Sequence, residues 1–211
     1  MLRWIAYIIS LTILVSLLTV GGGVWVFWKY GRDLPDYRQL ENYTPPITTR
    51  VYTGDGSLLE EYAFQRRSFV PVSSIPQSTI NAFLSAEDKN FYGHPGIDIF
   101  GVIRAIFTNI RNYGKGRRPV GASTITQQVA QNFLLTKEVS FVRKIREAII
   151  AFRMERVFTK DEILELYLNQ IYLGQGSYGI AEAANNYFGK SLDELKTEEA
   201  AFLAALPKAP N

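Results

Sequence analysis

Glu87 stands where a helical pattern calls for an apolar side chain. In the segment that begins near residue 78, apolar residues recur at helical spacing, and this acid is the next position on the same stripe. The stripe consists of Ile80, Phe83, Leu84 and Glu87. A carboxyl group in apolar surroundings binds a proton more readily than one in water, which suits a general acid or base. A simpler interpretation is an acid at a fraying helix end, paired with Lys89 or Arg104. Spacing alone does not decide between this interpretation and a general acid or base.

Glu147 is a second acid, and two cations accompany it. Arg143 and Lys144 fall in the first turn of a helix predicted to follow Ser140. The helix dipole disfavours cations there, so the pair indicates a nearby anion or acid. Glu147 follows Arg143 by four residues and Lys144 by three, within pairing distance on a helix. An acid beside two cations is expected to stay ionised at neutral pH. A surface salt bridge of little energetic value is the alternative.

A third polar segment, Gly121 to Gln128, opens a helix with hydroxyl and amide side chains. Ser123, Gln127 and Gln131 are spaced by four and share one side of that helix. A helix start that follows a glycine and carries hydroxyls suits a phosphate group. Ordinary N-capping by Ser123 or Thr124 explains the same residues.

The run from Trp4 to Trp28 contains no charged residue. At roughly 1.5 Å per residue, such a helix is longer than a hydrocarbon core of about 30 Å. Its aromatic residues lie toward the ends, as interfacial aromatics do, and it is too long for the apolar region of a cleaved signal peptide. We therefore predict a membrane anchor at 4–28 after a short N-terminal segment, 1–3. Positive charges flank the run on both sides, so the charge bias does not decide its orientation.

The rest of the chain divides into a stalk, a hairpin and helices. Residues 29–47 are polar and contain proline, and Gly54-Asp55-Gly56 is a hairpin turn signal at the start of a domain predicted to span 48–211. From Pro76 onward the pattern is mainly helical. A capping box at Thr159 begins one helix, which Gly174 is expected to stop, and Thr197 is expected to cap the last helix.

One helical segment, 97–110, is apolar nearly all round, which indicates core or membrane contact. A basic loop, 111–118, follows it and is either solvated or close to lipid phosphates. The composition limits other chemistry: no cysteine and a single histidine exclude disulfides, thiolate metal sites and histidine-rich metal sites. A net charge of +3 fits anionic lipid or phosphate as well as nucleic acid.

Five segments in register, across most of the chain after Pro76, resemble the motifs of peptidoglycan glycosyltransferases of bifunctional, class A penicillin-binding proteins. In order, the motifs are Glu87 to Gly96, Gly121 to Gln128, Arg143 to Glu147, Lys160 to Asn169, and Gly176 to Ala184. A single motif would be moderate evidence, whereas five in order are very specific. The resemblance implies a mainly α, lysozyme-like fold of two lobes with a small N-terminal β-hairpin, after one transmembrane helix.

The resemblance also implies a reaction. Lipid II, a disaccharide-pentapeptide on undecaprenyl diphosphate, is polymerised into glycan strands with inversion. Glu87 matches the general base that removes the proton of the acceptor hydroxyl. Glu147, Arg143 and Lys144 match the group beside the donor diphosphate. Glu147 would orient the two cations or help hold a divalent ion (Mg²⁺ or Mn²⁺), which some members use, although the sequence itself requires no cofactor.

Substrate binding is expected from further motif residues. Those expected to line the cleft with the two cations are Asp88, Ser123, Thr124, Gln127, Gln128 and Asn132. His94 is expected to order its loop, and fourth-motif residues to be mainly structural. Gln131 replaces a basic residue common in the family, and Arg117, Arg118 and Lys137 are the cations available to compensate for it.

The expected partners are lipid II, the growing glycan strand, the membrane and other cell-wall synthesis proteins, with no nucleic acid. Because the sugars of lipid II face outward, we expect a cytoplasmic N-terminus and a catalytic domain on the periplasmic or extracellular side of the bacterial inner membrane. The ending is similar to a link toward a transpeptidase domain, whose serine motif is absent, so we interpret the chain as a truncated bifunctional protein.

Two other functions fit parts of the sequence. A lytic enzyme of similar fold would cut glycan with two carboxylates, but glycan cleavage gives Arg143 and Lys144 no diphosphate to meet. A non-catalytic membrane scaffold would not require an acid on the apolar stripe.

Overall fold

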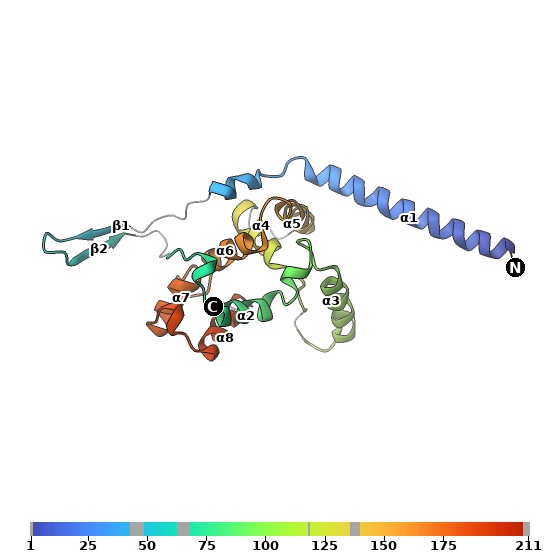
Figure 1. Cartoon of the computed structure of the whole chain (residues 1–211). Coiled ribbons are helices and arrows are strands. Elements are labelled where there is room, and N and C mark those ends of the chain that lie inside the picture. Colours follow the sequence, from blue (N-terminus) through green and yellow to red (C-terminus); the bar gives the residue numbers. More distant parts are fainter. Residues whose placement is uncertain (1, 43–48, 63–67, 118, 136–139, 209–211) are drawn as a thin grey trace.

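The computed structural model describes residues 2–42, 49–62, 68–117, 119–135 and 140–208. Arg118 and Lys137, two of the cations considered above, lie outside these ranges. Within them the chain is mainly helical, as predicted. A body of packed helices carries a long helix, α1, on one side and a two-stranded sheet on the other (Figure 1).

Helix α1 (Leu2–Gly31) confirms the predicted apolar N-terminal helix and extends past both ends of the span 4–28. Its most apolar 18-residue stretch has a mean hydropathy of 2.1 and no buried residue, so the helix is long and apolar enough to cross a membrane. The end of α1 packs on α5 (Phe141–Met154). There, Arg153 Nη2 donates to the Gly31 carbonyl at 3.0 Å and its guanidinium lies over the Phe27 ring.

Strands β1 (Thr49–Tyr52) and β2 (Leu58–Tyr62) pair antiparallel, with Thr49 opposite Tyr62. The turn between them is held by Asp55, whose carboxylate accepts from the Ser57 amide at 3.1 Å. Hydrogen bonds from the Thr53 hydroxyl and from Ser57 lower the pKa of Asp55 to about 2. A short 3-10 helix, Tyr37–Asn42, lies between α1 and the sheet.

The helices of the body bury one continuous apolar core. They are α2 (Gln77–Glu87), α4 (Ile125–Leu134), α5, α6 (Lys160–Gln170), α7 (Ile180–Phe188) and α8 (Thr197–Ala205). Helix α2 packs on α8, and α4 packs on α5 and α6. Fully buried side chains from these helices form the centre, among them Phe83, Ile125, Ile150, Leu164 and Leu203.

Helix α3 (Ile99–Asn112) stands apart from the body, on the same side as α1 (Figure 1). Asp98 caps it by accepting from the Gly101 amide at 2.9 Å. Only Gly101 and Ala105 of this helix are buried, whereas Phe100 is 83% exposed and Phe107 is 69% exposed. The apolar segment 97–110 is therefore not core.

Two helix boundaries differ from the prediction. Helix α6 ends at Gln170 rather than near Gly174, because Ile171 turns extended and its carbonyl accepts from the Gly179 amide at 2.9 Å. Thr197 is the first residue of α8 rather than its cap. The carboxylate of Glu199 reaches back to the Lys196 amide at 2.8 Å instead.

Candidate active site

Glu87 is the last residue of α2 and is half-buried. Its Oε2 atom accepts a hydrogen bond from Gln128 Nε2 at 2.9 Å, which joins the first and second motifs. Its Oε1 atom is buried without a hydrogen-bond partner. Among the residues that the structure describes, no ion pair joins this carboxylate to Lys89 or Arg104. The alternative, a helix-end acid paired with Lys89 or Arg104, is therefore not supported.

Asp88 and His94 hold the loop that follows α2. Asp88 is buried and its Oδ2 atom accepts from the Ile125 amide, in the first turn of α4, at 3.0 Å. His94 Nε2 lies 3.0 Å from both carboxylate oxygens. Both oxygens of Asp88 thus face protein groups, and the geometry fits the loop-ordering role expected of His94.

The polar residues at the start of α4 make a capping box. Thr124 Oγ1 accepts from the Gln127 amide at 3.2 Å, and Gln127 Oε1 accepts from the Thr124 amide at 3.0 Å. The Thr124 hydroxyl also donates to the Gly96 carbonyl at 2.6 Å. The capping alternative thus accounts for Thr124 and Gln127, and Gln127 is buried.

Glu147, on α5, is fully buried and faces two cations. Lys144 Nζ lies 2.6 Å from its Oε2 atom and also donates to Ser123 Oγ at 3.0 Å. Arg143 Nε lies 3.0 Å from Oε1, although the two atoms are not aligned as a hydrogen bond. Lys144 has the most exposed side chain of the cluster, at 45%, against 13% for Arg143 and none for Glu147.

A cleft of about 550 Å³ lies between the body and α3. Glu87, Asp88, Ser123 and Thr124 line one side, and residues of α3 including Phe100 and Arg104 line the other. Gln128 and Lys144 are not part of this lining, but they bond to Glu87 and Ser123, which are. Asn132 is exposed, two turns further along α4, and is not part of this lining.

Residues 55–211 match the family model described as Transglycosylase. The chain belongs to the transglycosylase family. That match contains every motif residue that lines the cleft.

The relatives of this transglycosylase chain are penicillin-binding proteins. It is 61% identical to Penicillin-binding protein 1A of Rickettsia conorii (strain ATCC VR-613 / Malish 7), over 95% of this chain and 26% of that protein. It is 48% identical to Penicillin-binding protein 1A of Aquifex aeolicus (strain VF5), over 96% of this chain and 27% of that protein. The crystal structure of Penicillin-Binding Protein 1A from Haemophilus influenzae is 31% identical, with a TM-score of 0.40, over 80% of this chain and 15% of that one. The chain spans about a quarter of the length of the curated relatives it matches.

The residues of this transglycosylase site do not fit a divalent metal ion at Glu147. Within the described ranges, no group of three or more His, Cys, Asp or Glu side chains comes together. Both Glu147 oxygens face cations instead. A divalent ion there would need other carboxylates, so the proposed reaction does not involve one.

Several contacts of the site were not evident in the sequence. Glu155 accepts from Thr126 Oγ1 at 2.6 Å and from Lys160 Nζ at 2.7 Å, and Lys160 also donates to the His94 carbonyl. Lys208 donates to the carbonyl of Ala86, directly before Glu87, at 2.9 Å. Apart from the Glu155–Lys160 pair, each contact joins segments far apart in the chain, and only the motif positions of the residues involved hinted at them.

Fourth-motif side chains tie α6 to the segment before α2. The Asn169 amide both accepts from the Val70 amide and donates to the Val70 carbonyl, each at 2.8 Å. Glu165 accepts from the Val72 amide at 2.7 Å. These bonds support the structural role expected of this motif.

Proposed function

We propose that this transglycosylase domain polymerises lipid II into glycan strands and releases undecaprenyl diphosphate. The observation that carries the proposal is a carboxylate that lines the cleft together with a cation bonded to the wall of the same cleft. Glu87, held by Gln128, lines it, and the half-exposed ammonium of Lys144 is bound to Ser123 in the same lining. A base and a cation at one site suit a substitution with a charged leaving group.

In the proposed step, Glu87 removes the proton from the acceptor sugar hydroxyl. The hydroxyl oxygen forms a bond to the anomeric carbon of the donor, and the bond from that carbon to the diphosphate oxygen breaks. The diphosphate leaves with the electron pair, and a single displacement of this kind inverts the anomeric centre. Lys144 and Arg143 stabilise the negative charge that develops on the leaving group.

Glu147 acts through the two cations in this proposal. Its buried carboxylate keeps Lys144 beside Ser123, where a diphosphate can meet it. The charge of the leaving group is then balanced by protein side chains rather than by a divalent ion. Asp88, Thr124 and Gln127 shape the cleft wall through their bonds to the backbone.

The membrane sets the topology of the proposal. We place α1 across the bacterial inner membrane with its N-terminus in the cytoplasm, and the catalytic domain on the outer face. Helix α3 would then form the smaller, membrane-facing lobe of a lysozyme-like fold, with its exposed apolar residues against lipid. Lipid II and the growing strand are the partners at the cleft, and other cell-wall synthesis proteins are the partners expected elsewhere.

A lytic enzyme of similar fold is the competing function. It also uses two carboxylates, each of which must reach the glycosidic bond. Glu147 is fully buried behind its cations and has no such access. The geometry therefore favours synthesis over cleavage.

The test is polymerisation of lipid II by the purified chain, followed as glycan products on a gel. Because a general base contributes about 10²- to 10⁴-fold, Glu87→Gln is expected to remove detectable polymerisation while the melting temperature is kept. The matched control is Glu198→Gln, which changes an exposed carboxylate on α8 and should leave the rate unchanged. Polymerisation at the wild-type rate by Glu87→Gln would contradict the assignment of the base.

A further inference from the structure

Two buried polar atoms without hydrogen-bond partners belong to the same part of the site. They are Oε1 of Glu87 and the hydroxyl of Tyr167, which lies on α6. Nearly all buried polar groups in proteins are hydrogen-bonded, so an unpaired acceptor and an unpaired donor at one place call for an explanation.

The packing places Tyr167 against α2, the helix that carries Glu87. Its side chain is 1% exposed, and its ring stands edge-on to Phe83 with the centroids 6.5 Å apart. Phe83 is one turn before Glu87 on α2, so the two side chains share a helix face. Tyr167 does not line the cleft, whereas Glu87 does. The tyrosine therefore approaches the carboxylate from the core side.

The charges around Tyr167 fit a hydrogen-bond donor. Burial first, and then the negative charges of Glu87 and Asp88, raise the pKa of Tyr167 well above its ordinary value of 10. The hydroxyl therefore keeps its proton at any working pH. Asp88 is already engaged by His94 and by the Ile125 amide, so of these two carboxylates Glu87 is the one with an unpaired buried oxygen.

We propose that Tyr167 is a positioning residue whose hydroxyl donates to Glu87 Oε1 during the reaction, while Gln128 holds Oε2. The inference rests on the proposed function, because it gives the base its orientation. With one donor on each oxygen, the carboxylate is fixed toward the acceptor hydroxyl. A donor to the charged form also favours carboxylate over acid, so Glu87 remains ready to accept the proton.

The experiment compares the full wild-type chain with Tyr167→Phe, using lipid II in nanodiscs and measuring kcat/KM against pH. Loss of a hydrogen bond to a charged group is expected to lower kcat/KM about ten-fold or more. Because the carboxylate loses a stabilising donor, the acidic limb of the profile should move to higher pH. The melting temperature should stay the same or rise, since phenylalanine fills the same space and removes an unpaired hydroxyl.

Tyr187→Phe is the matched control, because its hydroxyl donates to the Leu173 carbonyl at 2.9 Å rather than to the site. This variant should keep the acidic limb in place. If Tyr167→Phe retains the wild-type rate and limb, or if its rate and melting temperature fall together with the limb unmoved, the inference is wrong. A wild-type chain that polymerises no lipid II overturns the proposed function and the inference with it.

Discussion

Glu147 and Lys144 divide the work of a charged site between a buried residue and an exposed one. The carboxylate is fully buried, and its two oxygens face Arg143 and Lys144. A buried charge is tolerated when it is paired in this way, and removing one partner is costly. Lys144 keeps almost half of its side chain exposed and also contacts Ser123. In the proposed reaction the acid therefore fixes the geometry, and the lysine meets the substrate.

Lys144→Ala tests this division. Removing one charge-stabilising group is expected to lower kcat about 100-fold. Without Lys144 the buried Glu147 carboxylate keeps Arg143 as its cation, so the change should also cost about 1–3 kcal/mol of stability and lower the melting temperature by roughly 2–12 °C. Lipid II polymerisation and a thermal melt of the same preparation measure both quantities. Lys144→Arg keeps the cation and should recover most of the rate. A fall in melting temperature that accounts for the lost activity would instead favour a purely structural lysine.

At the scale of elements, the loop after α2 is clamped between α4 and α5. Gly96 has a φ of 88°, and a Cβ atom there would lie 2.8 Å from the carbonyl oxygen of Ala151 on α5. Its own carbonyl accepts from Thr124 at the start of α4. Glycine is thus required both by the left-handed backbone and by the close approach of a second backbone. This contact sets the position of Asp88 and His94 relative to the helices.

Gly96→Ala is expected to destabilise the fold by about 1–3 kcal/mol, because the backbone strain adds to a clash that no side-chain movement relieves. For a chain of this size the melting temperature should fall by roughly 2–12 °C. Gly114→Ala is the matched control, since its φ is also positive but no atom lies within 4 Å of the added Cβ. Equal losses in the two variants, measured by thermal melts, would show that the contact with α5 contributes nothing.

The sequence predicted those element features that depend on neighbouring residues. The capping box at Thr159 was predicted and is present, and the Thr124 cap, one of the alternatives that the sequence left open, is present too. Both depend on side-chain bonds within one helical turn. The predicted end of α6 at Gly174 was wrong. The Tyr172–Tyr178 bridge and the hydrogen bond from the Gly179 amide to the Ile171 carbonyl hold Ile171 outside the helix.

The site was predicted less completely, for the same reason. The stripe on α2 singled out Glu87, but helical periodicity cannot say which residue of another helix will meet it. The contact with Gln128 depends on how α2 and α4 pack, and Tyr167 had the pattern of an ordinary core residue. The order of the motifs predicted the roles of these segments, whereas the contacts between them could be seen only in the folded structure.

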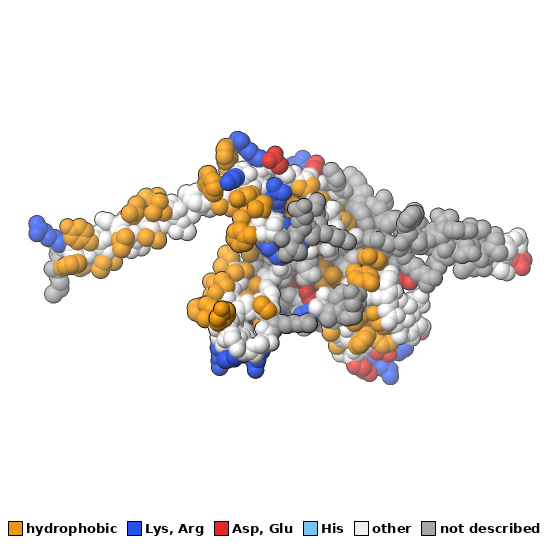
Figure 2. All heavy atoms as spheres, turned by 180° about the vertical axis from the view of Figure 1, so that it is seen from behind, with side chains coloured by type: hydrophobic (Ala, Val, Ile, Leu, Met, Phe, Trp, Pro, Cys, Tyr) orange, Lys and Arg blue, Asp and Glu red, His pale blue; other side chains and the backbone are white. Residues whose placement is uncertain are grey.

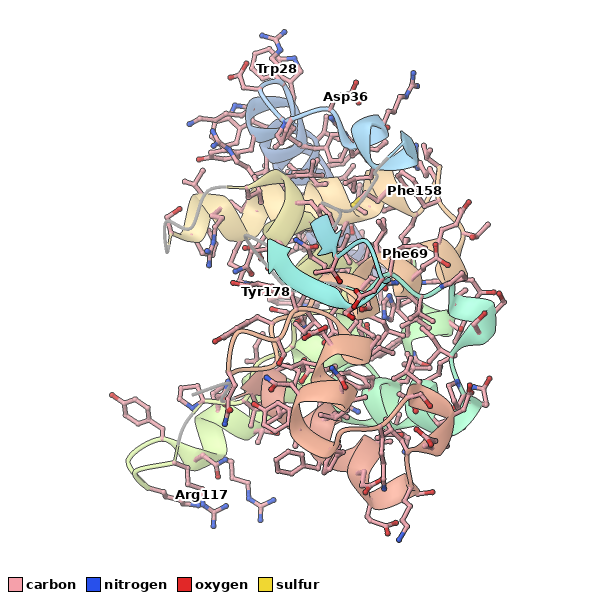
Figure 3. All side chains as sticks on the ribbon, turned by 90° about the vertical axis from the view of Figure 1, so that its left-hand side faces the viewer. Trp28, Asp36, Phe69, Arg117, Phe158 and Tyr178 are labelled. Carbon is pink, nitrogen blue, oxygen red and sulfur yellow. The ribbon has the colours of Figure 1, made fainter. Side chains whose placement is uncertain are left out.

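The whole molecule presents two separate apolar surfaces on one side. Helix α1 is exposed over most of its length, up to the end that packs on α5, and α3 exposes Ile99, Phe100, Ile103, Ile106, Phe107 and Ile110. Figure 2 shows both surfaces, with cationic side chains gathered at the tip of the α3 lobe, where Figure 3 labels Arg117. Apolar patches of this kind mark membrane or partner contact. The distribution fits a domain that is held to the bilayer by an anchor and rests on it through α3.

The last prediction concerns this second surface. Phe107→Glu combined with Ile110→Glu changes two side chains that are 69% and 67% exposed and do not line the cleft, so the melting temperature should hardly change. A carboxylate in the apolar part of a bilayer costs about 2 kcal/mol or more, so the lobe should leave the membrane. We expect lipid II polymerisation by the full chain in nanodiscs to fall at least about ten-fold. In detergent micelles, which adapt to the altered surface, the loss should be smaller.

Phe69→Glu is the control, because Phe69 is 47% exposed and lies away from the α3 lobe (Figure 3). An unchanged rate of the double variant in nanodiscs would mean that α1 alone sets the distance between the cleft and the lipid-linked substrate.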